Sequence, residues 1–146
     1  EVAVRAGIRN SLFNTLDDTY AVKLDEYLKS LKPVPSPLLV NGALSPAAER
    51  GKRVFDTAKC SRCHPAPLFT DMKLHRVGTA TGLEQDGKYD TPTLVEAWRT
   101  APYLHDGRAA SIADVITTCN QEGEHGDTAD LTQPEIDDLV AYVMSL

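Results

Sequence analysis

The sequence contains no run of eighteen consecutive apolar residues, so it predicts no membrane-spanning helix. Its first ten residues have neither the basic start nor the apolar stretch of a secretory signal peptide. Positive charge is also in deficit, and the formal net charge of −6 argues against nucleic acid or an anionic membrane surface as a partner. The apolar fraction of 42% is ordinary for a globular protein, and 146 residues give room for one domain with an appendage.

Cysteine is scarce, but its placement is the most informative feature of the chain. Three cysteines are present, and two of them stand in the segment Cys60-Ser61-Arg62-Cys63-His64. This spacing is the attachment signature of a c-type haem. A four-ligand zinc site would need a second Cys-x-x-Cys, and a thiol redox motif usually sits in a βαβ pattern; neither is found here. We therefore expect one covalently bound haem c, with thioethers from Cys60 and Cys63 and with His64 as the proximal iron ligand.

The third cysteine, Cys119, is left without a disulfide partner. It is expected either to be a buried thiol that behaves as a small apolar group, or to lie near the haem or bridge to another molecule. Covalent haem attachment takes place outside the cytoplasm in bacteria. The motif therefore also predicts a periplasmic or otherwise exported bacterial protein, and the absence of a signal peptide suggests a mature chain or a fragment.

Apolar spacing and capping residues predict a chain that is mostly helical. Helices are expected over residues 17–31, from Ser45-Pro46 into the haem motif, over 93–99, over 111–118 and from Thr132 to the end. Segments 65–92 and 120–130 are expected to be loops, because they are rich in glycine and polar residues. Three prolines within 33–37 predict an extended linker.

A short internal echo bears on domain organisation. Residues 27–31 and 142–146 share the pattern Tyr-x-x-Ser-Leu. The echo predicts that residues 1–41 are the trailing helix of an upstream domain followed by the proline-rich linker, and that residues 42–146 form a mono-haem domain. The alternative is that two amphipathic helices share these residues by chance. Loss of haem loading on truncation to residue 40 onward would show that the first helix belongs to this domain.

The sixth iron ligand is left open by the sequence. The candidates are His75, His105, His125, Met72, Met144 and Cys119. His125 ranks first because it lies in a loop before the terminal helix, between glycines that allow close approach to a flat ring. Met72 follows as the alternative, although it is only eight residues beyond His64, and an open position ranks third. A methionine would raise the iron potential relative to a second histidine, whereas an open position would admit peroxide.

Further sequence motifs indicate which family of haem proteins the chain resembles. They are Leu68-Phe69-Thr70-Asp71 with His75 and Gly78, Thr91-Pro92-Thr93-Leu94, Ala101-Pro102-Tyr103-Leu104-His105-Asp106-Gly107-Arg108, and a closing Leu-x-x-Tyr-x-x-Ser-Leu. In this order, over residues 42–146, they resemble the C-terminal haem domain of the bacterial di-haem cytochrome c peroxidase and MauG-like superfamily. The resemblance implies an all-α, cytochrome c-like helical domain with long haem-enclosing loops, here preceded by an extra N-terminal helix and the proline-rich linker.

The resemblance also implies site residues. Pro92, Leu94, Tyr103, His105 and Arg108 are expected around the haem, with His105 and Arg108 lining the pocket or bonding a propionate; a plain turn role for His105 is the alternative. The family's electron-transferring haem has a distal methionine before the last helix, where this chain has only Cys119 and His125 as candidate ligands. This departure favours two histidine ligands.

A di-haem enzyme needs two attachment motifs, and this chain has one. We therefore expect an electron-transfer domain, not a complete di-haem peroxidase, within a larger multi-domain oxidoreductase. Its partner would be the upstream domain or another redox protein. The alternative is a peroxidase-like enzyme with an open distal site that reduces hydrogen peroxide. In that case Tyr103, His105, Glu122 or Glu124 would be candidate acid–base groups.

Overall fold

The computed structural model describes residues 2–12, 17–82, 84 and 87–146, and the chain divides into two compact units, Glu1–Pro33 and Val34–Leu146. The first unit contains α1 (Val2–Asn10) and α2 (Asp18–Ser30). An ion pair joins Arg5 to the buried carboxylate of Asp25 across these two helices. The helix predicted over 17–31 is confirmed as α2, whereas α1 was not among the predicted helices.

The second unit is mostly helical, which confirms the all-α prediction. Its elements are α3 (Pro46–Thr57), the 3-10 turn η1 (Cys60–Arg62), β1 (Leu74–Arg76), β2 (Lys88–Asp90), the 3-10 turn η2 (Ala97–Arg99), α4 (Ile112–Ile116) and α5 (Gln133–Val143). The strands form one small antiparallel sheet, with His75 opposite Tyr89, inside the segment 65–92 that was predicted as loop. Residues 83, 85 and 86 of that segment lie outside the described residues.

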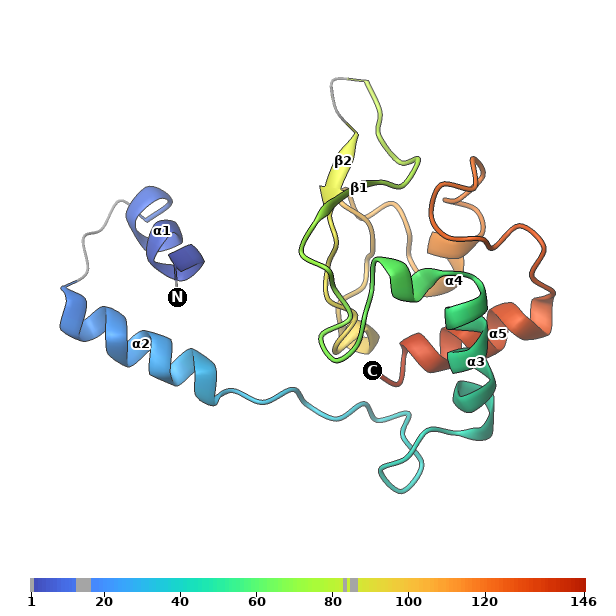
Figure 1. Cartoon of the computed structure of the whole chain (residues 1–146), viewed down its shortest axis with the longest axis horizontal. Coiled ribbons are helices and arrows are strands. Elements are labelled where there is room, and N and C mark those ends of the chain that lie inside the picture. The colour runs from blue at the N-terminus through green and yellow to red at the C-terminus, as the bar shows by residue number, and fades with distance from the viewer. Residues whose placement is uncertain (1, 13–16, 83, 85–86) are drawn as a thin grey trace. The chain divides into compact units, whose positions relative to one another are not determined.

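Helices α3 and α5 lie side by side and form the core of this unit (Figure 1). Gly51 is the point of closest approach, because a Cβ atom there would lie 1.8 Å from the Asp138 carbonyl oxygen. Phe55 of α3 meets Tyr142 of α5 edge-on, with ring centroids 5.3 Å apart. At the rim, the Arg50 guanidinium donates two hydrogen bonds of 2.6 Å to the Asp138 carboxylate. This packing fixes the helix that leads directly into the haem motif.

The predicted helix starts at Ser45, Ser111 and Thr132 are confirmed. The Ser45 hydroxyl accepts a hydrogen bond from the Ala48 N–H at 3.1 Å and so caps α3. Both predicted capping boxes form, one at Ser111 before α4 and one at Thr132 before α5. The predicted helix over 93–99 is wrong in its first part, because Glu96 adopts left-handed backbone (φ +64°) and only the 3-10 turn η2 follows it.

The proline-rich segment is partly built into the second unit. Ser36 is buried, and its hydroxyl donates to the Met144 carbonyl at 2.7 Å. The Val34 N–H donates to the Glu96 carboxylate. The contacts of the chain therefore divide at Pro33, and residues from Val34 onward pack with the unit that contains the haem motif.

Candidate haem-binding site

The two cysteines and the histidine of the motif sit on one tight turn. Helix α3 ends at Thr57, and Lys59 then adopts left-handed backbone (φ +62°), which redirects the chain into η1. The N–H groups of Cys63 and His64 both donate to the Cys60 carbonyl, at 3.3 and 2.9 Å. One turn thus presents two thiols and an imidazole together, as attachment of one porphyrin requires.

The thiols have the electrostatics of buried groups. Burial is the main cause that raises the pKa of Cys60, to about 11, and burial also raises the pKa of Cys63. A thiol that exchanges disulfides needs a lowered pKa, because the thiolate is the nucleophile. The raised values therefore argue against a thiol redox motif at this position.

A backbone carbonyl orients the His64 ring. His64 is buried, and its Nδ1 lies 2.9 Å from the Phe69 carbonyl oxygen. Burial, the largest cause, lowers the pKa of His64, so the ring is neutral at pH 7 and Nδ1 carries the proton that it donates. Nε2 is then the unprotonated nitrogen, which is the form that a metal ligand needs.

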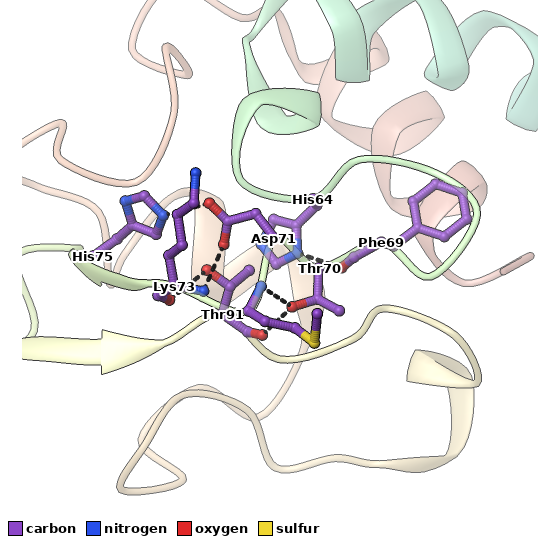
Figure 2. A network of polar contacts seen from close by, with 8 residues as sticks. His64, Phe69, Thr70, Asp71, Lys73, His75 and Thr91 are labelled. Atoms are coloured by element: carbon purple, nitrogen blue, oxygen red, sulfur yellow. Dashed lines mark hydrogen bonds and ion pairs between the residues drawn. The ribbon is translucent and has the colours of Figure 1, made fainter.

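Figure 2 shows the polar network that holds this carbonyl in place. Phe69 has left-handed backbone (φ +51°), which a non-glycine residue adopts only when its surroundings fix it. The Thr70 hydroxyl donates to the Thr91 carbonyl at 2.6 Å, which ties the segment after Phe69 to the start of the Thr-Pro-x-Leu block. The Asp71 N–H donates to the Cys63 carbonyl at 2.9 Å. The chain on both sides of His64 is therefore cross-linked by hydrogen bonds.

Asp71 is the charged member of the network. Its carboxylate lies 2.8 Å from His75 Nε2 and accepts from the Lys73 N–H at 3.0 Å (Figure 2). Partial burial opposes ionisation of Asp71, but the hydrogen bonds outweigh it and lower the pKa to about 2. Cys63, Asp71 and His75 place their ligand atoms within 4.8 Å of one another. Because Cys63 belongs to the attachment turn, these residues are part of the same site.

His125 lies opposite His64. The ring centroids of His64 and His125 are 6.4 Å apart, and the ring planes are tilted by 33°. Burial is the larger cause, and the neighbouring His64 the smaller one, that lowers the pKa of His125 to about 4. Its Nδ1 is buried without a hydrogen-bond partner among the described residues, and His125 lines the cavity.

Gly126 allows the segment after His125 to approach the attachment turn. It has left-handed backbone (φ +79°), and a Cβ atom there would lie 3.1 Å from the Ala58 carbonyl and 3.8 Å from the Cys60 sulfur. The Asp127 N–H donates to the same Ala58 carbonyl at 2.9 Å, and the Asp127 carboxylate pairs with Lys59. The flanking glycine thus allows close approach to the attachment turn, whereas the sequence analysis expected the glycines to allow close approach to a flat ring.

These groups line one cavity of about 790 Å³, within the size range of small-molecule and cofactor sites. A metal–imidazole bond is about 2 Å long and the bonded nitrogen lies about 1 Å from its ring centroid, so imidazoles on opposite sides of one metal have centroids roughly 6 Å apart. The observed 6.4 Å between His64 and His125 fits one metal ion between them. Two thiols beside the proximal ring and an apolar lining fit a haem.

The other predicted residues divide into two groups. Pro92, Leu94, Tyr103 and His105 line the cavity together with Cys60, Cys63, His64 and His125. Arg108, Met72, Met144 and Cys119 are not among the lining residues. Arg108 pairs instead with Asp106 at 2.6 Å, and Met72 is 78% exposed.

Among the lining residues, Tyr103 and His105 already have partners. The Tyr103 hydroxyl donates to the Ala97 carbonyl at 2.7 Å. His105 Nε2 lies 2.7 Å from the Glu84 carboxylate, and the His105 ring stacks on Tyr89 at 3.9 Å. Glu124 lines the cavity, whereas Glu122 does not. Of the four acid–base groups considered for an open distal site, Tyr103 and His105 thus already make other polar contacts.

Several residues of the site were missed by the sequence analysis. The Phe69 carbonyl acts through the backbone, which leaves no side-chain signal. Thr79 and Tyr89 line the cavity beside His105, and Tyr89 reaches it from β2, a strand that was not predicted. Asn120 contacts the backbone of His125. A signal for Asn120 did exist, because asparagine commonly closes short loops through its own amide.

The fold and the site together define a small helical domain whose cavity and attachment turn fit a covalently attached haem. The cytochrome c family profile matches residues 48–146, and the chain belongs to this family. Members of the family carry covalently bound haem c, and the Cys60-x-x-Cys63-His64 spacing is that of the attachment motif. In the described part of the chain, no helix has the length and apolar character needed to cross a bilayer.

Known relatives confirm the resemblance to the peroxidase and MauG-like superfamily. Hydrazine synthase subunit gamma of Kuenenia stuttgartiensis is 41% identical over 66 residues, which cover 44% of this chain and 19% of the relative. The methylamine utilization protein MauG of Methylophilus methylotrophus is 29% identical over 126 residues, which cover 71% of this chain and 38% of the relative. The cytochrome-c peroxidase IdrP1 of Denitromonas iodatirespirans is 27% identical over 154 residues, with coverages of 71% and 41%.

A solved structure of Kuenenia stuttgartiensis hydrazine synthase superposes with a TM-score of 0.73 at 29% identity. The match covers 82% of this chain and 52% of that chain. The chain thus spans less than half the length of the curated relatives that it matches. It is a cytochrome c haem domain related to the di-haem peroxidase and MauG-like proteins.

Proposed function

We propose that this domain holds a single haem c, with thioethers to Cys60 and Cys63 and with His64 and His125 as axial ligands, and that it passes single electrons. The observation that carries the proposal is the 6.4 Å separation of the two imidazole centroids within the cavity that the two thiols line. When bound, the haem supplies a one-electron ferric–ferrous couple. The chain supplies burial, orientation and two fixed ligands.

The protonation states of the two histidines support this role. The pKa of His125 is lowered to about 4 and the pKa of His64 is also lowered, so both rings are neutral and able to ligate at pH 7. Two ligands held by the protein in both oxidation states limit the rearrangement that accompanies electron transfer. A second histidine in place of methionine also lowers the redox potential.

The partner is proposed to be an attached domain or another redox protein. The matched relatives are more than twice as long as the aligned part of this chain, which is consistent with a domain of a larger multi-domain oxidoreductase. The net charge of −6 suits docking to a basic surface. Because haem c is attached outside the bacterial cytoplasm, an exported, periplasmic location follows from the proposal.

The domain boundary at residues 41/42 remains a proposal as well. Tyr142 of α5 is buried against Phe55, whereas its counterpart in the echo, Tyr27 of α2, is 60% exposed. An upstream domain that covered Tyr27 would give α2 the role that α5 has here. Haem loading of a chain that begins at residue 40, compared with the full chain, tests this assignment.

The test of the main proposal is visible spectroscopy of the haem-loaded protein. We expect one haem per chain by pyridine haemochrome, low-spin ferric and ferrous spectra, and no rapid reaction with carbon monoxide or peroxide. His125→Ala should give a high-spin ferric form that binds carbon monoxide when reduced. Met72→Ala is the control, because the Met72 side chain is exposed, and this variant should stay low-spin.

Two results would overturn the proposal. A wild-type protein that is high-spin and binds carbon monoxide at once would favour the peroxidase-like alternative with an open distal site. A low-spin spectrum that survives His125→Ala but turns high-spin in Met72→Ala would assign the sixth position to methionine instead.

A further inference from the structure

The side chain of Asn120 binds the backbone of the loop segment that carries His125. Asn120 Oδ1 accepts a hydrogen bond of 2.9 Å from the His125 N–H. Asn120 Nδ2 donates to the His125 carbonyl at 3.1 Å and to the Thr128 hydroxyl at 2.8 Å. Both ends of the amide are therefore used, and two of its three hydrogen bonds go to the backbone of His125 itself.

Other contacts fix both ends of this segment. At its C-terminal end, the buried Thr128 hydroxyl donates to the Ile116 carbonyl at 2.9 Å, which connects the Asn120 contacts to α4. The preceding residue, Asp127, is bound to Ala58 and Lys59 just after α3. At the N-terminal end, the Asn120 N–H donates to the Thr117 carbonyl at 3.0 Å. Between these ends, the Asn120 side chain binds the backbone of His125.

The two histidines are oriented in different ways. The His64 ring is held by its own hydrogen bond, from Nδ1 to the Phe69 carbonyl. The buried Nδ1 of His125 has no such partner among the described residues. A ligating histidine usually relies on a partner at its second nitrogen for orientation and basicity. Because His125 lacks one, its placement relies on its backbone, which Asn120 holds.

We propose that Asn120 is a positioning residue that holds His125 at the sixth coordination position and thereby decides how firmly that position is closed. The inference rests on the proposed ligation by His64 and His125. Loss of Asn120 would let the His125 segment move away from His64, while the turn that carries Cys60, Cys63 and His64 stays in place. A neutral exogenous ligand could then replace the imidazole of His125, and this ligand exchange involves no oxidation or reduction.

The experiment compares Asn120→Ala with wild type in the haem-loaded full chain. We expect a mixed or high-spin ferric spectrum and carbon monoxide binding to the ferrous form that is roughly fivefold faster or more, since one net hydrogen bond corresponds to about a fivefold change in the equilibrium between the closed and open sixth position. Free imidazole should restore the low-spin spectrum, because it replaces the missing ligand.

Three further variants make the outcome decisive. Thr128→Val removes one hydrogen-bond partner of the Asn120 amide and keeps a side chain of similar shape. It should shift the spin state in the same direction as Asn120→Ala, and it tests the proposal even if Asn120→Ala fails to load haem. Ser111→Ala is the matched control, because it removes the capping box at the other end of α4 and should leave the spectrum unchanged. His125→Ala gives the reference spectrum for loss of the ligand.

The possible failures can be told apart. If His125→Ala stays low-spin, the proposed ligation is wrong and the role of Asn120 falls with it. If His125→Ala is high-spin while both Asn120→Ala and Thr128→Val keep wild-type spectra and carbon monoxide rates, only the role of Asn120 is refuted. If Ser111→Ala changes the spectrum as much as Asn120→Ala does, the effect is general destabilisation, which also refutes it.

Discussion

Substitution of Gly51 by alanine tests the packing that supports the haem motif. The new Cβ atom would lie 1.8 Å from the Asp138 carbonyl oxygen and 2.9 Å from the Tyr142 Cβ atom, where an ordinary contact begins at 3.4 Å. The Asp138 carbonyl oxygen belongs to the backbone, so no change of side-chain rotamer can relieve this clash. Helices α3 and α5 would therefore have to separate by more than an ångström along the interface that buries Phe55 and Leu139.

The expected net effect is a large loss of stability. Alanine is favoured over glycine inside a helix by about 1 kcal/mol. Overpacking costs typically about 1–3 kcal/mol, and occasionally more. Since the clash involves backbone, we expect a net loss of about 2 kcal/mol or more, which lowers Tm by roughly 8 °C or more for the unit Val34–Leu146.

Thermal unfolding followed by far-UV circular dichroism and by haem absorbance measures this effect. Gly7→Ala is the matched control, because Gly7 lies within α1 and nothing stands within 4 Å of the position of its missing Cβ. That variant should melt no lower than wild type. A Gly51→Ala protein with an unchanged or raised Tm would show that α3 and α5 do not approach as closely as the structure has them.

Three further predictions concern α5, the acid response and the support of His64. Thr132→Ala removes the capping box of α5 and should lower the free energy of unfolding by about 1 kcal/mol in urea titration. Hydrogen bonds from Arg108 lower the pKa of Asp106 to about 2, below its unfolded value, so this pair stabilises the fold above about pH 4 and the contribution is lost as the pH falls to about 2. Asp106→Asn should therefore flatten the pH dependence of Tm in that window, and an unchanged slope would contradict the assignment. Thr70→Val removes the hydrogen bond to the Thr91 carbonyl, should loosen the carbonyl that holds His64, and should raise the haem potential in a potentiometric titration.

The parts of the fold that could be predicted are those set by local chemistry. The serine before Pro46 and the capping boxes at Ser111 and Thr132 specify helix starts within four residues of sequence, and all three form. The spacing from Cys60 to His64 likewise fits a single turn. Such signals need no knowledge of what lies across the molecule.

The parts that could not be predicted depend on competing side-chain hydrogen bonds, on very short strands or on a distant partner. The predicted helix over 111–118 ends at Ile116, and the Thr117 and Thr118 hydroxyls then bond to carbonyls one turn back. Strands β1 and β2 have three residues each, which is too short for an alternating pattern to be visible. Ser36 is buried in a segment that reads as a linker, because its partner is the carbonyl of Met144 at the far end of the chain.

The candidate site likewise has one part that is specified by local sequence and one part that depends on other contacts. The proximal side is a short-range motif with its own helix, α3, anchored by α5. The distal side is a loop segment whose position rests on the amide of Asn120 and on the contacts of Asp127 and Thr128. Under the proposed ligation by His125, changes in this loop would alter the coordination of the iron without disturbing the core, because the two depend on different contacts. On that proposal, a closed site suited to electron transfer and an open site suited to small ligands would differ by a few hydrogen bonds in one loop.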